Sequence, residues 1–284
     1  MKYLKEFIRP ALLGVAISGI MIIVMLKVTM DLQWLLFLGS VLYFTAGTLT
    51  PGSGYAVFAK ALLVNLFYAL PFVLLVLPQL PGLWYFILIY IVFAWSGMLF
   101  SKYRRPISIF LLGVSAITVV LAVYVLPKNL ESSLTSQRND AIPSWELAMV
   151  SGEAISTEEL KGKVLVFDFF GTWCKPCIKE LKVLDAVREK FETVEDVRFF
   201  VINADIGGDT PEKFQQFIND SDYGFGYAYD HGSALYKELD LESKGLPTLL
   251  VVDKQGTITW MHVGYNSAET GFESTLVSVI EDLK

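Results

Sequence analysis

The hydrophobic pattern divides the chain into two parts of different character. In the first part, long apolar stretches follow one another with short turn-forming breaks at 31, 50–54, 78–82 and 102–106; the stretches are 8–30, 32–50, 55–77, 83–100 and 107–126. A helix needs about 20 apolar residues to cross the hydrocarbon core of a bilayer. We therefore predict an all-α membrane domain of about five transmembrane helices over residues 1–127. Because apolar segments continue after the first one, we expect no cleaved signal peptide.

From about residue 142 the pattern changes to short apolar runs that alternate with helical stretches. Strands are predicted at 145–150, 154–155, 164–170, 197–203, 225–229, 248–252 and 257–263, and helices at 177–191, 211–218, 233–239 and from 267 onward. This alternation is typical of an α/β domain, here placed at 142–284. Residues 128–141 are polar and Ser-rich without an apolar period, which predicts a linker between the two domains.

Charge follows the same division. Residues 1–126 hold ten charged side chains with a net charge of +6, whereas residues 127–284 hold the other 42 with a net charge of −12. An acidic soluble domain repels phosphate backbones, so we expect no nucleic-acid partner.

The basic residues of the first part predict its orientation in a membrane. With the N-terminus in the cytoplasm, five spans leave two basic residues outside, Lys27 and Lys128, and seven inside: Lys2, Lys5, Arg9, Lys60, Lys102, Arg104 and Arg105. Such a bias is typical of cytoplasmic segments. The second domain is therefore expected outside the cytoplasm, in the periplasm of a diderm bacterium or its equivalent, tethered to the inner membrane.

The two cysteines of the chain stand together, as Cys174 and Cys177 in a Cys-Lys-Pro-Cys segment that follows the predicted strand 164–170. On the first turn of a helix, two sulfurs at this spacing can close a disulfide, and the free N–H groups there favour a thiolate. Half of a zinc site is an alternative, but His231 and His262 lie far from the pair in sequence. Two unrelated core cysteines are a second alternative. Neither explains the flanking Trp173 and intervening Pro176, so we predict a redox-active pair.

A family resemblance rests on two segments. The active-site segment of the membrane-tethered TlpA/ResA-type thioredoxins is similar to residues 167–180, Phe-Asp-Phe-Phe-Gly-Thr-Trp-Cys-Lys-Pro-Cys-Ile-Lys-Glu. The second segment is Lys-Gly-Leu-Pro-Thr at 244–248, before an apolar strand that ends in Asp-Lys-Gln-Gly at 253–256. The resemblance covers about residues 142–284 and not the first domain. It implies a thioredoxin-like α/β fold, with a central mixed sheet flanked by helices, and a thiol-disulfide oxidoreductase whose only redox group is the disulfide.

The two cysteines are expected to have different roles. Cys174, the more exposed one, is expected to attack a substrate disulfide as a thiolate, and Cys177 to resolve the mixed disulfide. Pro176 suits a helix start, where a missing N–H leaves no group unpaired. Lys175 either favours the thiolate by its positive charge or is only a solvated surface residue.

Two acidic residues are candidate supporting groups. Asp168 interrupts an apolar run, and a carboxylate buried there is costly unless it is protonated or paired. The resemblance makes it a proton acceptor for Cys177; the alternative is an exposed acid at a strand end. Glu180 lies three residues after Cys177 on one helix face. The resemblance makes it a residue that tunes the cysteines, and the alternative is a first-turn acid that complements the helix dipole.

The remaining candidates are one proline, one tryptophan and the histidines. The resemblance implies a cis peptide bond at Pro247, facing the cysteines, with an open backbone edge near Leu246 on which a substrate strand can pair. Trp173 is expected to shield the disulfide, although a core tryptophan would give the same pattern. We expect His231 and His262 to be structural.

We therefore predict a membrane-bound, extracytoplasmic enzyme that reduces protein disulfides. The first domain contains no cysteine, so a separate membrane thiol electron donor is implied. Five spans exceed what an anchor needs, which favours docking to another membrane protein; the alternative is a multi-helix anchor without a further role. Two alternatives stay open: a structural or docking subunit of a membrane assembly, and a thiol oxidase or isomerase.

Overall fold

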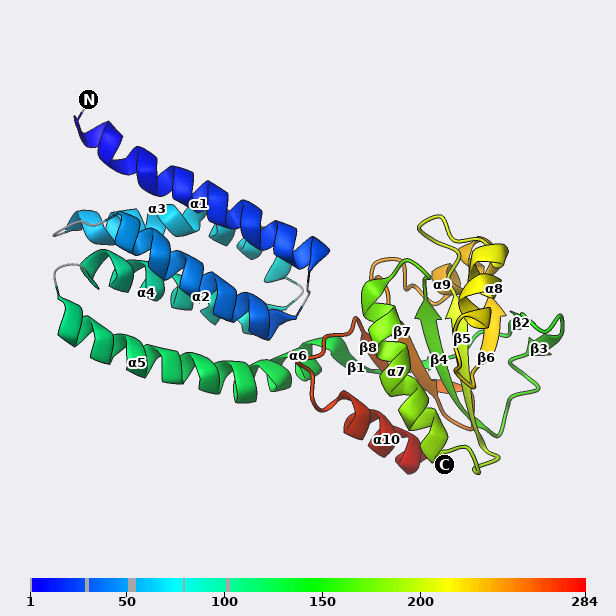
Figure 1. Cartoon of the computed structure of the whole chain (residues 1–284). Coiled ribbons are helices and arrows are strands. Elements are labelled where there is room, and N and C mark those ends of the chain that lie inside the picture. The colour runs from blue at the N-terminus through cyan, green and yellow to red at the C-terminus, as the bar shows by residue number, and fades with distance from the viewer. Residues whose placement is uncertain (1, 29–30, 51–54, 79, 101–102) are drawn as a thin grey trace. The chain divides into compact units, whose positions relative to one another are not determined.

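A computed structural model describes residues 2–28, 31–50, 55–78, 80–100 and 103–284 (Figure 1). Parts of three predicted interspan breaks, at 51–54, 79 and 102, lie outside the described residues. The chain forms two compact units, residues 1–133 and residues 134–284. We call them the helical unit and the thioredoxin-like unit.

The helical unit contains the apolar helices predicted from the sequence. They are α1 (Lys2–Lys27), α2 (Leu32–Leu49), α3 (Tyr55–Pro71) with a π-helical turn at Phe72–Val76, α4 (Tyr85–Phe100) after a 3₁₀ turn at Pro81–Leu83, and α5 (Arg104–Val120). Four segments are long and apolar enough to cross a membrane: Glu6–Met25, Leu32–Leu49, Ala56–Val76 and Arg104–Leu134. Helix α4 is strongly apolar but has only 16 residues.

Helices α2 and α4 approach each other closely at two glycines. A Cβ atom at Gly47 would lie 2.2 Å from the carbonyl oxygen of Ala94 and 2.9 Å from the Cα of Gly97. Small residues allow this backbone contact, which is the way helices commonly pack in membranes. Nearby, Tyr43 stacks on Tyr90 with a centroid distance of 5.0 Å.

The prediction that residues 128–141 form an irregular linker is wrong. Helix α5 continues through a π-helical turn, Leu121–Val125, into α6 (Leu126–Leu134), and β1 (Thr135–Ala141) follows at once. β1 pairs antiparallel with β8 (Thr257–Val263). Its side chains are mostly exposed, because an edge strand of this kind is held by backbone hydrogen bonds rather than by an apolar face. The polar composition that suggested a tether therefore belongs to an edge strand.

The thioredoxin-like unit is built on one mixed eight-stranded sheet. The strand order is β1-β8-β7-β4-β5-β6-β2-β3, and β4, β5 and β6 are parallel while the other pairs are antiparallel. The additional strands are β2 (Glu146–Met149), β3 (Ala154–Ser156), β4 (Val164–Phe170), β5 (Val197–Asn203), β6 (Gly226–Tyr229) and β7 (Thr248–Val252). This is the predicted fold class.

Helices cover both faces of this sheet (Figure 1). α7 (Lys175–Lys190), α8 (Pro211–Asn219) and α10 (Phe272–Leu283) contribute side chains to the core on one face, and α9 (Ala234–Glu238) contributes to the core on the other. Thr210 caps α8, accepting a hydrogen bond from the backbone N–H of Lys213. Helix α10 begins five residues later than predicted, because a turn at 267–271 precedes it.

Strand β4 positions the site. All seven of its residues are buried, and successive side chains alternate between the two cores. Val166 and Phe170 belong to the core beneath α7, whereas Phe167 and Phe169 belong to the other. Asp168 stands two residues from both Val166 and Phe170, so its carboxyl group faces the α7 side.

Candidate active site

The cysteine pair lies where β4 passes into α7. Cys174 is the N-cap residue of α7, and its sulfur accepts a hydrogen bond from the backbone N–H of Cys177 at 3.3 Å. Pro176 stands in the first turn. The two sulfurs form a disulfide. Cys174 is 4% exposed and Cys177 is fully buried, so Cys174 is the one of the two that lies nearer the surface. This ordering matches the roles expected for the two residues.

Asp209 holds the loop that precedes the cysteines. Its Oδ2 accepts hydrogen bonds from the backbone N–H of Thr172 and from Nδ2 of Asn203, both at 2.8 Å, and its Oδ1 accepts one from the Thr172 hydroxyl. The carboxylate is almost completely buried. Sequence reasoning missed this residue, because it lies 37 positions after Thr172 in a polar loop.

Trp173 is not a core residue. Its indole N–H donates to the carbonyl of Ile206 at 2.9 Å, and its ring lies against the backbone of Gly207, where a Cβ atom would come within 2.3 Å of the ring. The side chain is nonetheless 52% exposed. The alternative of a buried structural tryptophan is therefore wrong, and the exposed ring stands directly before Cys174.

The segment before β7 lies beside the active-site loop. The Leu246–Pro247 peptide bond is cis, as the resemblance implies. The Leu246 side chain lies 3.3 Å from the position that a Cβ of Gly171 would occupy. Thr248, the next residue, pairs with Phe169 of β4. The register of the central sheet thus brings Leu246-Pro247 to the loop that carries the cysteines.

Asp168 is a buried acid without a hydrogen-bond partner among the described residues. Its side chain is fully buried, and both carboxyl oxygens lack a hydrogen-bond partner within the described part of the chain. Burial, which penalises the charged form, raises its pKa from 3.8 to about 8. The alternative of a strand-end acid exposed to water is wrong. A carboxyl group with this pKa exchanges protons near neutral pH, which suits it to proton transfer.

Glu180 is a second buried acid on the same face. Its side chain is fully buried, and its carboxyl oxygens accept no hydrogen bond from the described residues. Burial raises its pKa well above 4.5, and the negative charges of Asp168 and Glu269 raise it further. Helix α7 begins at Lys175, so Glu180 lies in the second turn and points inward. The alternative that Glu180 is a first-turn acid complementing the helix dipole is therefore wrong. Lys175 is exposed at the helix start.

His262 and Glu269 complete a cluster that sequence reasoning did not foresee. His262 is 1% exposed, its Nε2 lies 2.8 Å from Oε1 of Glu269, and its Nδ1 lies 3.8 Å from Oε1 of Glu180. Leu249 of β7 pairs with both Asp168 and His262 on its two sides, so the three side chains stand in one row across the sheet. Four elements therefore bring one histidine and three acids together. His231, in contrast, is exposed on the surface.

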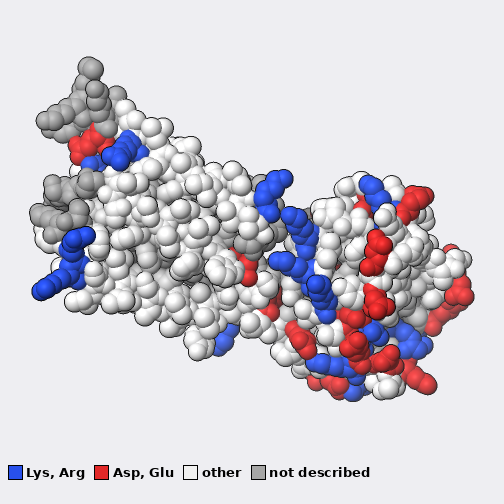
Figure 2. Space-filling model, in the orientation of Figure 1, with Lys and Arg blue, Asp and Glu red and all other residues white. Residues whose placement is uncertain are grey.

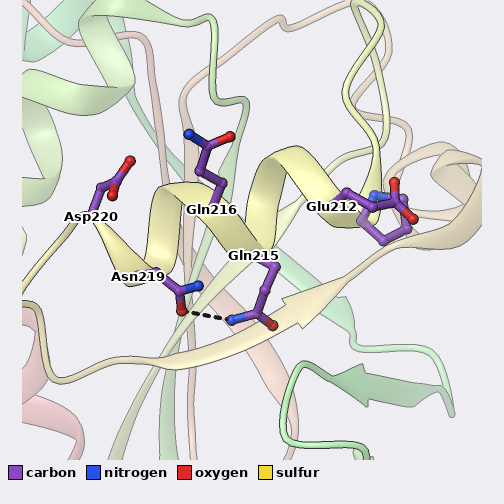
Figure 3. A pocket seen from close by; sticks show the side chains of 6 residues that line it. Glu212, Gln215, Gln216, Asn219 and Asp220 are labelled. Carbon is purple, nitrogen blue, oxygen red and sulfur yellow. Dashed lines mark hydrogen bonds between the residues drawn. The ribbon is translucent and has the colours of Figure 1, made fainter.

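Metal binding finds no support in the described part of the chain. No set of three or more His, Cys, Asp or Glu side chains there is arranged to hold a metal ion. An open hollow runs along α8 and is lined by polar residues, of which Gln215 and Asn219 are joined by a 3.0 Å hydrogen bond (Figure 3). It includes none of the residues that surround the cysteines.

Comparison with known proteins agrees with this geometry. Residues 139–261 match the AhpC/TSA family. The thiol-disulfide oxidoreductase ResA of a Bacillus cereus strain is 30% identical over 128 residues, which cover 45% of this chain and 70% of that protein. The ResA protein of Halalkalibacterium halodurans is 26% identical over 156 residues, covering 54% and 84%.

Among solved structures, a putative thiol:disulfide interchange protein DsbE from Chlorobium tepidum superimposes with a TM-score of 0.45 and 21% identity, over 50% of this chain and 97% of that one. The ResA matches, together with the cysteine pair at the start of α7, lead to one conclusion. Through its second part, this chain belongs to the ResA family of thiol-disulfide oxidoreductases.

Proposed function

We propose that this oxidoreductase is bound to the bacterial inner membrane and reduces disulfides of proteins outside the cytoplasm. The observation that carries the proposal is the asymmetry of the cysteine pair: Cys174 keeps an exposed fraction of 4%, while Cys177 is fully buried on the side of Asp168 and Glu180. An enzyme that forms and resolves mixed disulfides needs this arrangement, because one sulfur must contact the substrate and the other must attack the mixed disulfide afterwards.

Two exchange steps then account for the reaction. The Cys174 thiolate attacks one substrate sulfur, the substrate S–S bond breaks, and its other sulfur leaves as a thiolate that takes up a proton. Cys177 then loses its proton and attacks the Cys174 sulfur, and the bond between Cys174 and the substrate breaks. The substrate gains two electrons and two protons, and the cysteine pair loses the same number.

Asp168 is proposed as the proton acceptor of the second step. Cys177 is fully buried, so its thiol cannot hand its proton directly to bulk water. The carboxyl of Asp168 faces the same core as Cys177, and with a pKa of about 8 it releases and takes up protons near neutral pH.

The substrate surface is proposed to consist of Trp173 and the Leu246-Pro247 segment. The tryptophan ring is exposed immediately before Cys174, and Leu246 borders the same loop at Gly171. An extended peptide can lie along such a segment and pair with its backbone. Protein disulfides fit this surface better than small disulfides, which would leave the apolar ring uncovered.

Membrane attachment and sidedness rest on the helical unit. Four of its described segments have the length and composition of membrane spans, and the excess of basic residues in its expected cytoplasmic segments favours an outward thioredoxin-like unit. One residue of that count needs revision: Lys60 lies within α3, is 3% exposed and pairs with Glu6 at 2.6 Å. Without Lys60, six basic residues lie in the expected cytoplasmic segments and two lie outside, which favours the same orientation.

Electrons must come from another protein. Both cysteines of the chain lie in the thioredoxin-like unit, so the helical unit cannot pass electrons by thiol exchange. We propose a separate membrane thiol donor, and a membrane-protein partner for the helical unit, because the apolar helices α1 to α5 of its described residues exceed what an anchor requires.

The test is a trapping experiment with the full chain in its native membrane. In Cys177→Ser the mixed disulfide with Cys174 cannot be resolved, so substrates should accumulate as covalent adducts that mass spectrometry identifies. The matched control is the double variant Cys174→Ser/Cys177→Ser, which has no thiol and should trap nothing. Adducts with extracytoplasmic cysteine-containing proteins support the proposal. A folded variant that traps nothing would favour a docking subunit, and a measured potential more oxidising than the glutathione couple would favour an oxidase.

A further inference from the structure

The buried acids present a chemical difficulty that the second exchange step must overcome. Asp168 and Glu180 are both fully buried, neither has a hydrogen-bond partner among the described residues, and each raises the cost of a charge on the other. Under these conditions the ionised form of each carboxyl is disfavoured. A protonated carboxyl cannot accept the proton of Cys177, so a positive charge close by favours the ionised form that this step needs.

His262 is placed to supply that charge. Its Nδ1 faces Oε1 of Glu180 at 3.8 Å and has no hydrogen bond to a described residue, while its Nε2 is held by Glu269 at 2.8 Å. The ring is fixed from its flat sides as well: Trp260 is stacked near it with a centroid distance of 5.6 Å, and Phe272 lies at 4.7 Å. Packing and the contact with Glu269 therefore fix the orientation of the His262 ring, and Nδ1 is the ring nitrogen that faces Glu180.

Among the described residues, the other elements packed against the His262 ring bring no second cationic side chain close to it. The titratable groups that face this cluster are Asp168 from β4, Glu180 from α7, Glu269 before α10, and Tyr265 after β8. Burial and then the negative charges of Glu180 and Glu269 raise the pKa of Tyr265, so it stays neutral. Among the side chains described in this cluster, His262 alone can become positive.

We propose that His262, oriented by Glu269, is a positioning residue that keeps a carboxylate available behind Cys177 by acting as the cationic partner of Glu180. This inference rests on the proposed role of Cys177 as the resolving thiol. In the resolving step the Cys177 proton passes to the carboxylate pair, the Cys177 sulfur bonds to Cys174, and the leaving substrate sulfur takes the electron pair. On reduction the proton returns to Cys177.

The first measurement is the protonation of the ring in the wild-type full chain in detergent. The chain has two histidines, so ¹⁵N-histidine labelling gives two sets of ring signals, and exposed His231 serves as the internal reference. We expect the His262 ring of the reduced protein to carry two protons at pH 7. A neutral His262 ring throughout pH 6–8 would overturn the proposal without any variant.

The second measurement is the rate of each exchange step in His262→Asn, which keeps a polar side chain near Nδ1 but removes the charge. We expect the pH at which resolution is half-maximal to rise by about one unit, which is about a tenfold slower step at pH 7. The first attack by Cys174 should change less than twofold. Glu273→Gln, an exposed acid of α10 that pairs with Lys190, is the matched control and should leave both steps unchanged.

The outcomes separate this proposal from the proposed function. If wild type resolves mixed disulfides through Cys177 and folded His262→Asn has an unchanged pH profile, His262 is only structural while the function stands. If wild type forms no mixed disulfide at all, the proposed function fails irrespective of His262. A lower melting temperature alone, without a shift in the pH profile, would also count against the positioning role.

Discussion

The helical unit and the thioredoxin-like unit differ in opposite ways from an ordinary water-soluble domain: the first exposes large apolar side chains, and the second buries acidic ones. Among the described residues, all large apolar side chains with high exposure lie in the helical unit except Trp173. The thioredoxin-like unit instead buries acids in its interior: Asp168, Glu180, Asp209, Asp230 and Glu269. Figure 2 shows the same contrast on the surface, since charged side chains cover the thioredoxin-like unit and are sparse on the helical one.

Functional residues are therefore recognised by different signs in the two units. An exposed leucine costs nothing where lipid surrounds the helix, so outward apolar residues in the helical unit indicate its solvent rather than a binding site. In the thioredoxin-like unit water is the solvent, so the exceptions carry information. One exposed tryptophan and a group of buried acids both lie around the cysteine pair. Burying an acid without a hydrogen-bond partner costs stability, and we infer that these acids are kept for the chemistry.

The strongest test of this division is to remove the outer sulfur of the cysteine pair. Cys174→Ser should abolish insulin reduction by the full chain, down to the uncatalysed rate, because the remaining thiol, Cys177, is fully buried and the helical unit contains no cysteine. A turbidity assay of insulin precipitation measures this directly. Residual activity well above that rate would mean that another group attacks the substrate.

Neutralising the central buried acid should have the next largest effect. Asp168→Asn keeps the size of the side chain and removes the base, so resolution should slow by about 100-fold or more while the first attack is little changed. Stopped-flow measurement of the two steps across pH checks this. An unchanged resolution rate would remove Asp168 from the proton path.

The same substitution makes a prediction about stability. The pKa of Asp168 is about 8 in the folded protein and 3.8 as its ordinary value. The wild type therefore loses stability as pH rises from about 4 to 8, since unfolding releases the buried acid to ionise in water. Asp168→Asn lacks this loss. Its melting temperature should exceed that of wild type at pH 8, and the difference should shrink toward pH 4.

A positive charge should act very differently on exposed sites of the two units. Leu112 on α5 is 72% exposed, and Leu112→Lys should disfavour insertion of segment 104–134 by about 3 kcal/mol if lipid covers it. A translocon-insertion reporter measures the inserted fraction. Ala186→Lys on the exposed side of α7 is the matched change in water and should alter stability by less than about 0.5 kcal/mol. Equal insertion of wild type and Leu112→Lys would contradict a lipid-facing α5.

The smallest effect concerns packing within the helical unit. Gly47→Ala places a methyl group against the α4 backbone, where a Cβ would lie 2.2 Å from the Ala94 oxygen, and should cost about 1–3 kcal/mol. At Gly113 on α5 a Cβ meets no described atom within 4 Å, so Gly113→Ala should be neutral or slightly stabilising. Thermal unfolding in detergent compares the two. Equal melting temperatures would mean that α2 and α4 are not in contact at Gly47.

Local pattern was enough to predict most of the fold. Strands at 164–170, 197–203, 248–252 and 257–263 were predicted at the observed bounds, because each combines a buried apolar run with flanking turn residues. β1 was not predicted, since its polar side chains show no period and only pairing with β8 makes it a strand. The late start of α10 reflects the turn that places Glu269.

The site was predictable only where its residues are near in sequence. The cysteines, Asp168 and Glu180 fall within 13 residues, so the motif and the odd polar position in β4 identified them. Asp209, His262 and Glu269 are distant in sequence and meet the site through the strand register and the turn before α10. His262 within an apolar strand was the one available signal, and it was assigned a structural role.

The pairing of β1 with β8 has a practical consequence for anyone producing the thioredoxin-like unit on its own. A fragment that starts at residue 142 would leave one edge of β8 bare, along a strand that contains Trp260 and Met261. Unpaired edges of this kind recruit strands from neighbouring copies and cause aggregation. In the whole chain β1 covers that edge and ends the sheet with polar side chains, Arg138 and Asp140 among them, and with a break in its pairing register. A fragment that begins at or before residue 134 would keep this protection and should remain monodisperse at the concentrations that crystallisation and NMR require.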